Sequence, residues 1–188
     1  GVLKATSVKV GFMNTEYAAA VETLLAAKEA LAGFDTKLIG SLFADNPLYG
    51  GLEPHHMMPL AKDGDCDGFL IDTLTKDGRN LFDFMPEPAL REIVLEGKEA
   101  QQSTALSGHL RMSDLDELAR INPDIVGVRG AVCQKGDRAD GVYWEAVAEF
   151  KRQVDIRKSG QVDVFDGAVI SNLGGNGTDT KGANGWAV

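Results

Sequence analysis

The residues of this sequence that are best placed for chemistry follow a short apolar run near its middle. The run Phe69 to Ile71 leads directly into Asp72, and Lys76 stands four residues further on. In open α/β sheets and barrels, polar groups at the carboxyl end of a buried parallel strand form the reactive site. A carboxylate there can transfer protons, and an amine can hold a phosphate or attack a carbonyl. An ordinary turn with a solvated ion pair is the alternative interpretation of these residues.

Two further cations stand in or after other apolar runs. Lys9 alternates with Val8 and Val10, so on a strand it points away from them. If helices cover the apolar side, Lys9 lies on the interior side, which is uncommon for a lysine without a partner or a function. Arg129, followed by Gly130, ends a later apolar run, where we expect an anion ligand or a buried ion-pair partner. For Lys9, a solvated position on an edge strand is the alternative.

A small turn and a histidine pair are the remaining candidates. Ser107, Gly108 and His109 follow the run Thr104 to Leu106. Small residues at the carboxyl end of a strand let the backbone approach a ligand, and free N–H groups there suit a phosphate. Many such turns bind nothing, so the pattern alone does not decide. The pair His55-His56 does not predict a metal site, because adjacent side chains diverge and no third ligand stands at a useful spacing.

These candidates must be positioned by five strand–helix units in alternation. The expected strands lie near Lys9, Leu38, Ile71, Ala105 and Val128, and helical periodicity separates them. This alternation predicts the α/β class, with a parallel sheet and helices outside it. No Gly-x-Gly-x-x-Gly turn and no Walker-type loop follows the first strand. A dinucleotide or nucleoside-triphosphate domain is therefore not expected.

Composition excludes several classes of partner. The 188 residues carry 28 acidic and 19 basic side chains, a net charge of −9, with no basic stripe, so neither nucleic acid nor a membrane surface is expected as a partner. No apolar run approaches the roughly 20 residues of a membrane-spanning helix. The two cysteines, Cys66 and Cys133, and the absence of a signal-peptide pattern predict a reducing cytoplasm. We expect one domain in residues 1–158 and a glycine-rich, partly flexible extension in residues 159–188.

The sequence resembles the (5-formylfuran-3-yl)methyl phosphate synthase family of methanofuran biosynthesis. The blocks that carry the resemblance are residues 7–11, 71–73 with 76–84, and 127–133 with 136–138. The resemblance extends from about Ser7 to Val154. It implies a TIM (β/α)8 barrel, of which this sequence supplies about the last five strand–helix units plus a C-terminal extension. It also implies condensation of two molecules of glyceraldehyde 3-phosphate to 4-(hydroxymethyl)-2-furancarboxaldehyde phosphate, through a lysine Schiff base and with neither a metal nor another cofactor.

The resemblance also implies roles for particular residues. Lys9, Asp72 and Lys76 match catalytic residues of the family, with Asp72 as the acid/base group. Ser107-Gly108-His109 and Arg129-Gly130 fall where the family's late strands hold substrate phosphate. Two features depart from the family. The turn that ends in His109 usually reads Ala-Gly-Ser, and the Asp-x-Lys-Asn-Pro segment that carries the Schiff-base lysine does not occur here.

Five strands cannot close an eight-stranded barrel, and three explanations stay open. An upstream part is missing, as the start at Gly1 without Met suggests; another chain or copy completes the barrel, so that the protein is an oligomer; or the chain is a divergent homologue without the chemistry. Two alternative functions stay open with them. One is a non-catalytic subunit that binds a phosphorylated ligand or a partner. The other is a phosphosugar isomerase or epimerase that uses Asp72 as a base without a Schiff base.

Overall fold

The computed structural model of the protein describes residues 3–75, 77–136 and 139–160. Strands and helices alternate along this part of the chain, as the apolar pattern predicts. The strands are β1 (Ser7–Phe12), β2 (Lys37–Phe43), β3 (Gly68–Asp72), β4 (Ser103–Leu106) and β5 (Ile125–Val126). The α-helices are α1 (Tyr17–Ala30), α2 (Met57–Asp63), α3 (Glu87–Glu99), α4 (Leu115–Ile121) and α5 (Trp144–Lys158). Several loops contain short 3-10 helices, among them η1 (Asn46–Tyr49) and η5 (Gly130–Val132).

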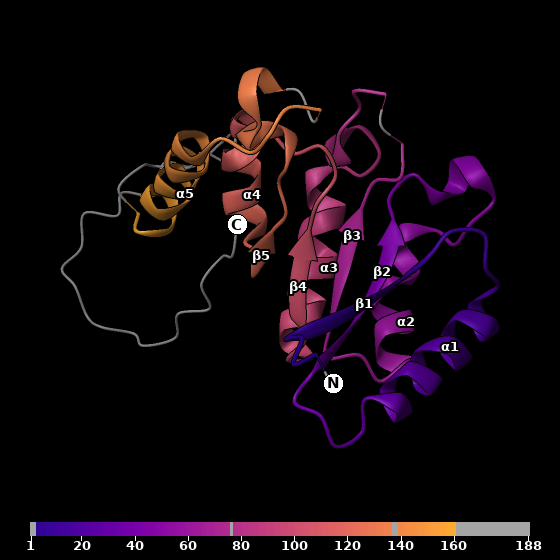
Figure 1. The fold of residues 1–188 in the computed structure, drawn as a ribbon. Coiled ribbons are helices and arrows are strands. Elements are labelled where there is room, and N and C mark those ends of the chain that lie inside the picture. The colour runs from indigo at the N-terminus through magenta and orange to yellow at the C-terminus, as the bar shows by residue number, and fades with distance from the viewer. Residues whose placement is uncertain (1–2, 76, 137–138, 161–188) are drawn as a thin grey trace.

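The five strands form one parallel sheet. Each strand pairs with the next one along the chain, in the order β1-β2-β3-β4-β5 (Figure 1). The predicted α/β class and the parallel sheet are therefore confirmed. Within the described residues β1 and β5 pair with one neighbour each, so the sheet has two edges there and is not seen to close into the predicted TIM (β/α)8 barrel.

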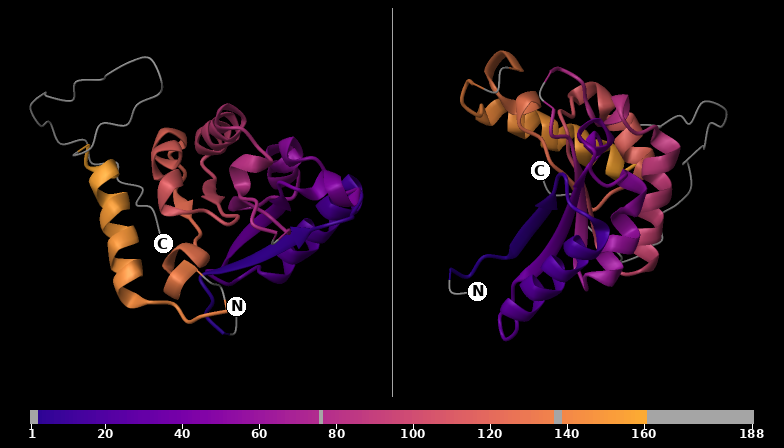
Figure 2. Two further views of the ribbon diagram at one scale, coloured as in Figure 1. Left: turned by 90° about the horizontal axis from the view of Figure 1, so that it is seen from above. Right: turned by 90° about the vertical axis from the view of Figure 1, so that its right-hand side faces the viewer.

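Helices cover one face of the sheet. Helices α1 and α2 contact β2, and α3 contacts β4 (Figure 2). Alternate strand residues point into this layer and are fully buried: Leu38, Leu42, Phe69, Ile71 and Leu106. Burying a large apolar side chain contributes about 1.5–3 kcal/mol, so this layer supplies most of the packing that holds the strands in place. Helix α5 extends the layer beyond β5, where it packs on α4 and η5.

The opposite face of the sheet is not covered by any helix in the described part of the chain. Lys9 pairs in register with Ile39, and Leu70 pairs with Ala105, so these side chains share this face. Ile39 and Leu70 are half-buried, and Lys9 is exposed. The prediction that Lys9 points away from the helices is confirmed. It is exposed rather than buried because no described element packs over it.

The fifth strand is shorter than its sequence predicts. The apolar run suggests a strand from Ile125 to Val132, but the strand ends at Val126. At Arg129 the backbone has φ −136° and ψ −63°, which leaves the extended region, and η5 begins at the next residue. Arg129 therefore stands in a loop beyond the sheet rather than at the end of a strand.

Candidate active site at the carboxyl ends of the strands

Asp72 is the last residue of β3 and is half-buried. Its Oδ1 accepts a hydrogen bond from the N–H of Thr73 at 2.8 Å, and its main-chain oxygen accepts one from the N–H of Ala44 at 2.7 Å. These contacts fix both the backbone and one carboxylate oxygen. From the described residues, Oδ2 accepts no hydrogen bond. Asp72 thus offers one oriented oxygen for proton transfer at the carboxyl end of the sheet.

A second carboxylate, Asp45, lies beside Asp72 and was missed in the sequence. It lies two residues after the end of β2 and has 0% of its surface exposed. Its Oδ1 accepts from the N–H of Leu74 at 2.8 Å and its Oδ2 from the N–H of Thr75 at 2.6 Å. Burial alone would raise the pKa of Asp45, but hydrogen bonds from the Thr75 side chain and from these N–H groups lower its pKa overall. Asp45 is therefore a buried anion that binds the loop after β3.

The predicted catalytic Lys76 belongs to this same loop and lies outside the residues that the structure describes. Its described neighbours are held on both sides. Before it, the Thr75 and Tyr49 hydroxyl oxygens are 2.6 Å apart. After it, Asp77 forms an ion pair with Arg79 at 2.8 Å.

The loop is also tied to the segment that follows β4. The guanidinium of Arg111 donates to the carbonyl oxygen of Gly78 at 2.7 Å. The side-chain amide of Asn80 donates to Asp114 at 3.0 Å, and Asp114 also accepts from the N–H of Arg111 at 2.8 Å. The loops after β3 and β4 therefore form one hydrogen-bonded unit.

The turn after β4 lies directly against the end of β3. Gly108 has φ +120°, and a Cβ there would lie 2.8 Å from the Thr73 side chain. Its carbonyl oxygen accepts from the N–H of Leu81 at 2.9 Å. Only glycine fits this position, because any side chain would both strain the backbone and collide with Thr73. The structure thus brings the predicted residues Ser107, Gly108 and His109 next to Asp72.

The end of β5 completes the group. A Cβ at Gly127 would lie 3.1 Å from Cβ and 3.2 Å from Oγ of Ser107, so the two strand ends are in close contact. Arg129 and Gly130 follow this contact, with Arg129 exposed at the start of η5. The structure therefore gathers Asp72, the turn after β4, and the start of the loop after β5 at one end of the sheet.

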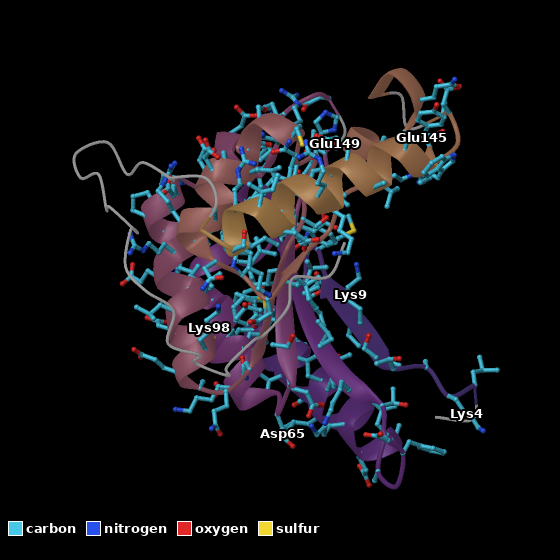
Figure 3. The ribbon with its side chains drawn as sticks, turned by 90° about the vertical axis from the view of Figure 1, so that its left-hand side faces the viewer. Lys4, Lys9, Asp65, Lys98, Glu145 and Glu149 are labelled. Carbon is cyan, nitrogen blue, oxygen red and sulfur yellow. The ribbon has the colours of Figure 1, made fainter. Side chains whose placement is uncertain are left out.

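Lys9 does not lie at the carboxyl ends of the strands with these residues. Its register partner is Ile39, whose partner on β3 is Gly68, four residues before Asp72. Four residues span roughly 13 Å along a strand. Figure 3 shows Lys9 on β1, on the side of the sheet away from the helices that cover the other face. Lys9 therefore lies on the same uncovered face of the sheet as Asp72, which we call the open face, but nearer to the amino ends of the strands.

The described residues offer little that could hold a metal. They contain no group of three or more His, Cys, Asp or Glu side chains close enough to share an ion. His55 and His56 stack on each other, with ring centroids 4.1 Å apart, and His56 lies against the ring of Tyr17 at 5.9 Å. In the same part of the chain, no helix has the length and apolar character to cross a membrane.

Comparison with known proteins gives a family match over most of the chain. The model of the 4-HFC-P synthase family matches residues 2–151. Three curated relatives, each named (5-formylfuran-3-yl)methyl phosphate synthase, come from Methanopyrus kandleri, Methanococcus maripaludis and Methanobrevibacter smithii. The chain is 38%, 37% and 36% identical to them, over 71%, 73% and 80% of its own length. It spans between 57% and 65% of the length of these relatives.

Proposed function

Because this chain belongs to the 4-HFC-P synthase family, we propose that it carries acid/base and phosphate-binding residues of a (5-formylfuran-3-yl)methyl phosphate synthase. The observation that carries the proposal is the meeting of Asp72 and Ser107–His109 at the ends of β3 and β4, with Arg129–Gly130 in the loop that follows the adjacent β5. Parallel α/β sheets place their chemistry at this end. A half-buried carboxylate beside a glycine turn suits a phosphorylated substrate that must gain and lose protons.

The proposed reaction condenses two molecules of glyceraldehyde 3-phosphate to 4-(hydroxymethyl)-2-furancarboxaldehyde phosphate, with loss of one phosphate and of water, in methanofuran biosynthesis. A lysine amine forms a Schiff base with one substrate carbonyl, and nearby cations keep this amine partly neutral. Lys9 and Lys76 supply positive charge in this scheme. Asp72 moves protons during the dehydrations through its free Oδ2. No metal or other cofactor is required.

Backbone N–H groups are the proposed phosphate ligands. Within the described residues, the N–H groups of Gly108 and Gly130 donate to no protein acceptor. Gly108 is buried, and a buried N–H without an acceptor is costly. A phosphate oxygen would accept from such a group, and in this proposal Ser107 adds a hydroxyl and Arg129 a positive charge.

The proposed site requires a closed barrel, which is a further part of the proposal. The strand order, with each strand beside the next, fits a (β/α)8 barrel and differs from doubly wound sheets, whose order reverses. The open face and the two sheet edges leave room for the three remaining strands. We propose that the rest of the same polypeptide, or another copy or chain, supplies them. The free, buried thiols of Cys66 and Cys133 suit a cytoplasmic enzyme.

A turnover assay tests the proposal. The full-length natural protein is incubated with glyceraldehyde 3-phosphate, and the furan product is followed by its ultraviolet absorbance. We expect Asp72→Asn to lower kcat by roughly 10²- to 10⁴-fold, because it removes a general acid/base. The matched control is Asp77→Asn, which neutralises an exposed carboxylate in the same loop.

The outcomes separate the alternatives. Full activity in Asp72→Asn would contradict the proposed role of this residue. Binding of the triose phosphate without turnover by the unaltered protein would favour the non-catalytic subunit. Turnover that borohydride cannot trap as a covalent adduct would favour an isomerase or epimerase, because only an imine is reduced to a stable amine.

A further inference from the structure

Asp45 is a buried carboxylate to which the proposed reaction gives no role. We infer that Asp45 is a positioning residue, which holds the loop after β3 and thereby the orientation of Asp72. The inference rests on the proposed function. It starts from the two hydrogen bonds that Asp45 accepts, from Leu74 at 2.8 Å and from Thr75 at 2.6 Å. Both donors belong to the turn that begins at Asp72.

The hydrogen bonds of this turn form a continuous series. The N–H of Thr73 is bound by the Asp72 carboxylate, and the next two N–H groups are bound by the Asp45 carboxylate. The residue before Asp45, Ala44, donates its N–H to the main-chain oxygen of Asp72 at 2.7 Å. Residues 44–45 therefore form three hydrogen bonds with residues 72–75. If Asp45 releases Leu74 and Thr75, the turn in which Thr73 orients the Asp72 carboxylate loses two of its backbone hydrogen bonds.

The negative charge of Asp45 strengthens these hydrogen bonds. A fully buried carboxylate stays ionised only when hydrogen bonds replace its water. Here the N–H groups and the Thr75 side chain lower its pKa despite burial, so both backbone hydrogen bonds are charge-assisted at neutral pH. An ionised carboxylate can only accept hydrogen bonds, so the Thr75 hydroxyl donates its proton to Asp45. The Thr75 oxygen can then accept a hydrogen bond from the Tyr49 hydroxyl, whose oxygen is 2.6 Å away. Tyr49 thus supports the same loop from outside.

Asp67 provides a matched control within the same chain. It lies just before β3, at the opposite end of the sheet, and accepts from the N–H of Leu38 at 2.8 Å and from Lys28 at 3.0 Å. Asp67 therefore also binds a backbone N–H of a neighbouring segment, and its pKa is also lowered. It differs from Asp45 in its distance from the proposed chemistry. Any effect that both variants share reports folding, and an effect of Asp45 alone reports the site.

The experiment compares Asp45→Asn with Asp67→Asn in the full-length natural protein. Asparagine keeps the volume but turns one acceptor into a donor, which faces the N–H of either Leu74 or Thr75. We expect kcat for glyceraldehyde 3-phosphate to fall roughly 10- to 100-fold in Asp45→Asn, since a small misplacement of a catalytic group costs that much. We also expect KM to stay near its original value, because a misplaced acid/base group affects the chemical step rather than substrate binding. In Asp67→Asn kcat and KM stay unchanged, while the melting temperature falls.

Hydrogen exchange supplies a second readout that needs no substrate. The amide protons of Leu74 and Thr75 should exchange faster in Asp45→Asn than in the unaltered protein, and at the original rate in Asp67→Asn. If Asp45→Asn does not fold, Tyr49→Phe replaces it. Removing this hydroxyl loosens Thr75 without burying a new polar group, and it should lower kcat in the same direction by a smaller factor.

Different results would contradict the proposed function and the positioning role of Asp45. An unaltered protein that does not convert glyceraldehyde 3-phosphate contradicts the proposed function, and the exchange rates then decide whether Asp45 holds the loop. An active protein in which Asp45→Asn keeps the kcat of Asp67→Asn overturns the positioning role. Unchanged exchange at Leu74 and Thr75 in Asp45→Asn overturns it as well.

Discussion

At the scale of single residues, the contact between the ends of β3 and β4 depends on Gly108. Its φ of +120° lies in a region that favours glycine, and the Thr73 side chain occupies the place of a Cβ at 2.8 Å. The same residue offers a buried N–H to the proposed phosphate and a carbonyl oxygen to Leu81. One small residue therefore sets the distance between Asp72 and the turn that follows β4.

We expect Gly108→Ala to lower both stability and substrate affinity. The left-handed backbone and the collision with Thr73 together should lower the free energy of unfolding by about 2 kcal/mol or more, measured by urea titration. KM for the triose phosphate should rise because the turn moves away from Thr73. The control is Gly33→Ala, where φ is +82° but nothing lies within 4 Å of the added Cβ. Equal losses in both variants would mean that backbone strain, and not the contact with Thr73, explains the effect.

At the scale of elements, buried or half-buried aspartates anchor neighbouring segments at both ends of the sheet. Asp67, just before β3, binds the N–H of Leu38 in β2 at 2.8 Å. Asp124, just before β5, accepts from both the N–H and the hydroxyl of Thr104 in β4 at 2.9 Å. Asp45 does the same for the loop after β3 at the other end. Each of these hydrogen bonds fixes one segment relative to its neighbour. Hydrogen bonds depend on direction, so they fix this position more precisely than apolar packing alone.

The Asp67 contact predicts a loss of stability in acid. Burial would raise the pKa of Asp67, but the N–H of Leu38 and the ammonium groups of Lys28 and Lys37 outweigh it and lower the pKa. A lowered pKa means that the stabilisation is complete above the unfolded-state value of about 3.9 and is lost as the pH falls through the folded-state value. Asp67→Asn should lower the free energy of unfolding by roughly 1–2 kcal/mol at neutral pH.

The measurement is urea unfolding at a series of pH values from neutral to about pH 3, near the range where carboxylates titrate. The difference between the unaltered protein and Asp67→Asn should shrink as the pH falls through this range. Asp65→Asn is the control, because Asp65 is an exposed neighbour. A difference that stays constant across the series would show that the charge of Asp67 is not what stabilises β2 against β3.

The elements were largely predictable from the sequence, and the contacts between them were not. Apolar periodicity located the first four strands and the start of the fifth, and it showed that Lys9 points away from the helices, because alternation is a local property. The level of Lys9 relative to Asp72 depends on the register across three strands, which no local pattern encodes. Asp45 followed by Asn46 and Pro47 has the composition of a surface turn. Its burial arises only because β3 ends beside β2, and the one available signal was its position directly after a strand.

At the scale of the whole molecule, one face of the sheet is covered by no helix in the described part of the chain. Ile39 and Leu70 are half-buried there, and Ile125 has 36% of its surface exposed. A hollow of about 1470 Å³ follows the amino ends of the strands, and its lining includes Ile39, Ala105 and Ile125 from the open face together with Met58 and Phe69 from the helix-covered face. Sheets with two unpaired edges and an apolar open face are prone to associate with further strands. The proposed barrel would bury this face and remove both edges.

Barrel closure predicts a large difference between two leucines that are both partly exposed in the described chain. Leu70 points to the open face, and Leu95 lies on α3 with 56% of its surface exposed. In a closed barrel Leu70 becomes a core residue, so Leu70→Ala in the full-length natural protein should cost about 2–5 kcal/mol in urea unfolding. Leu95→Ala should stay within about 0.5 kcal/mol, as surface substitutions do. Equally small losses would mean that the sheet stays open, and the catalytic proposal would then give way to the non-catalytic subunit.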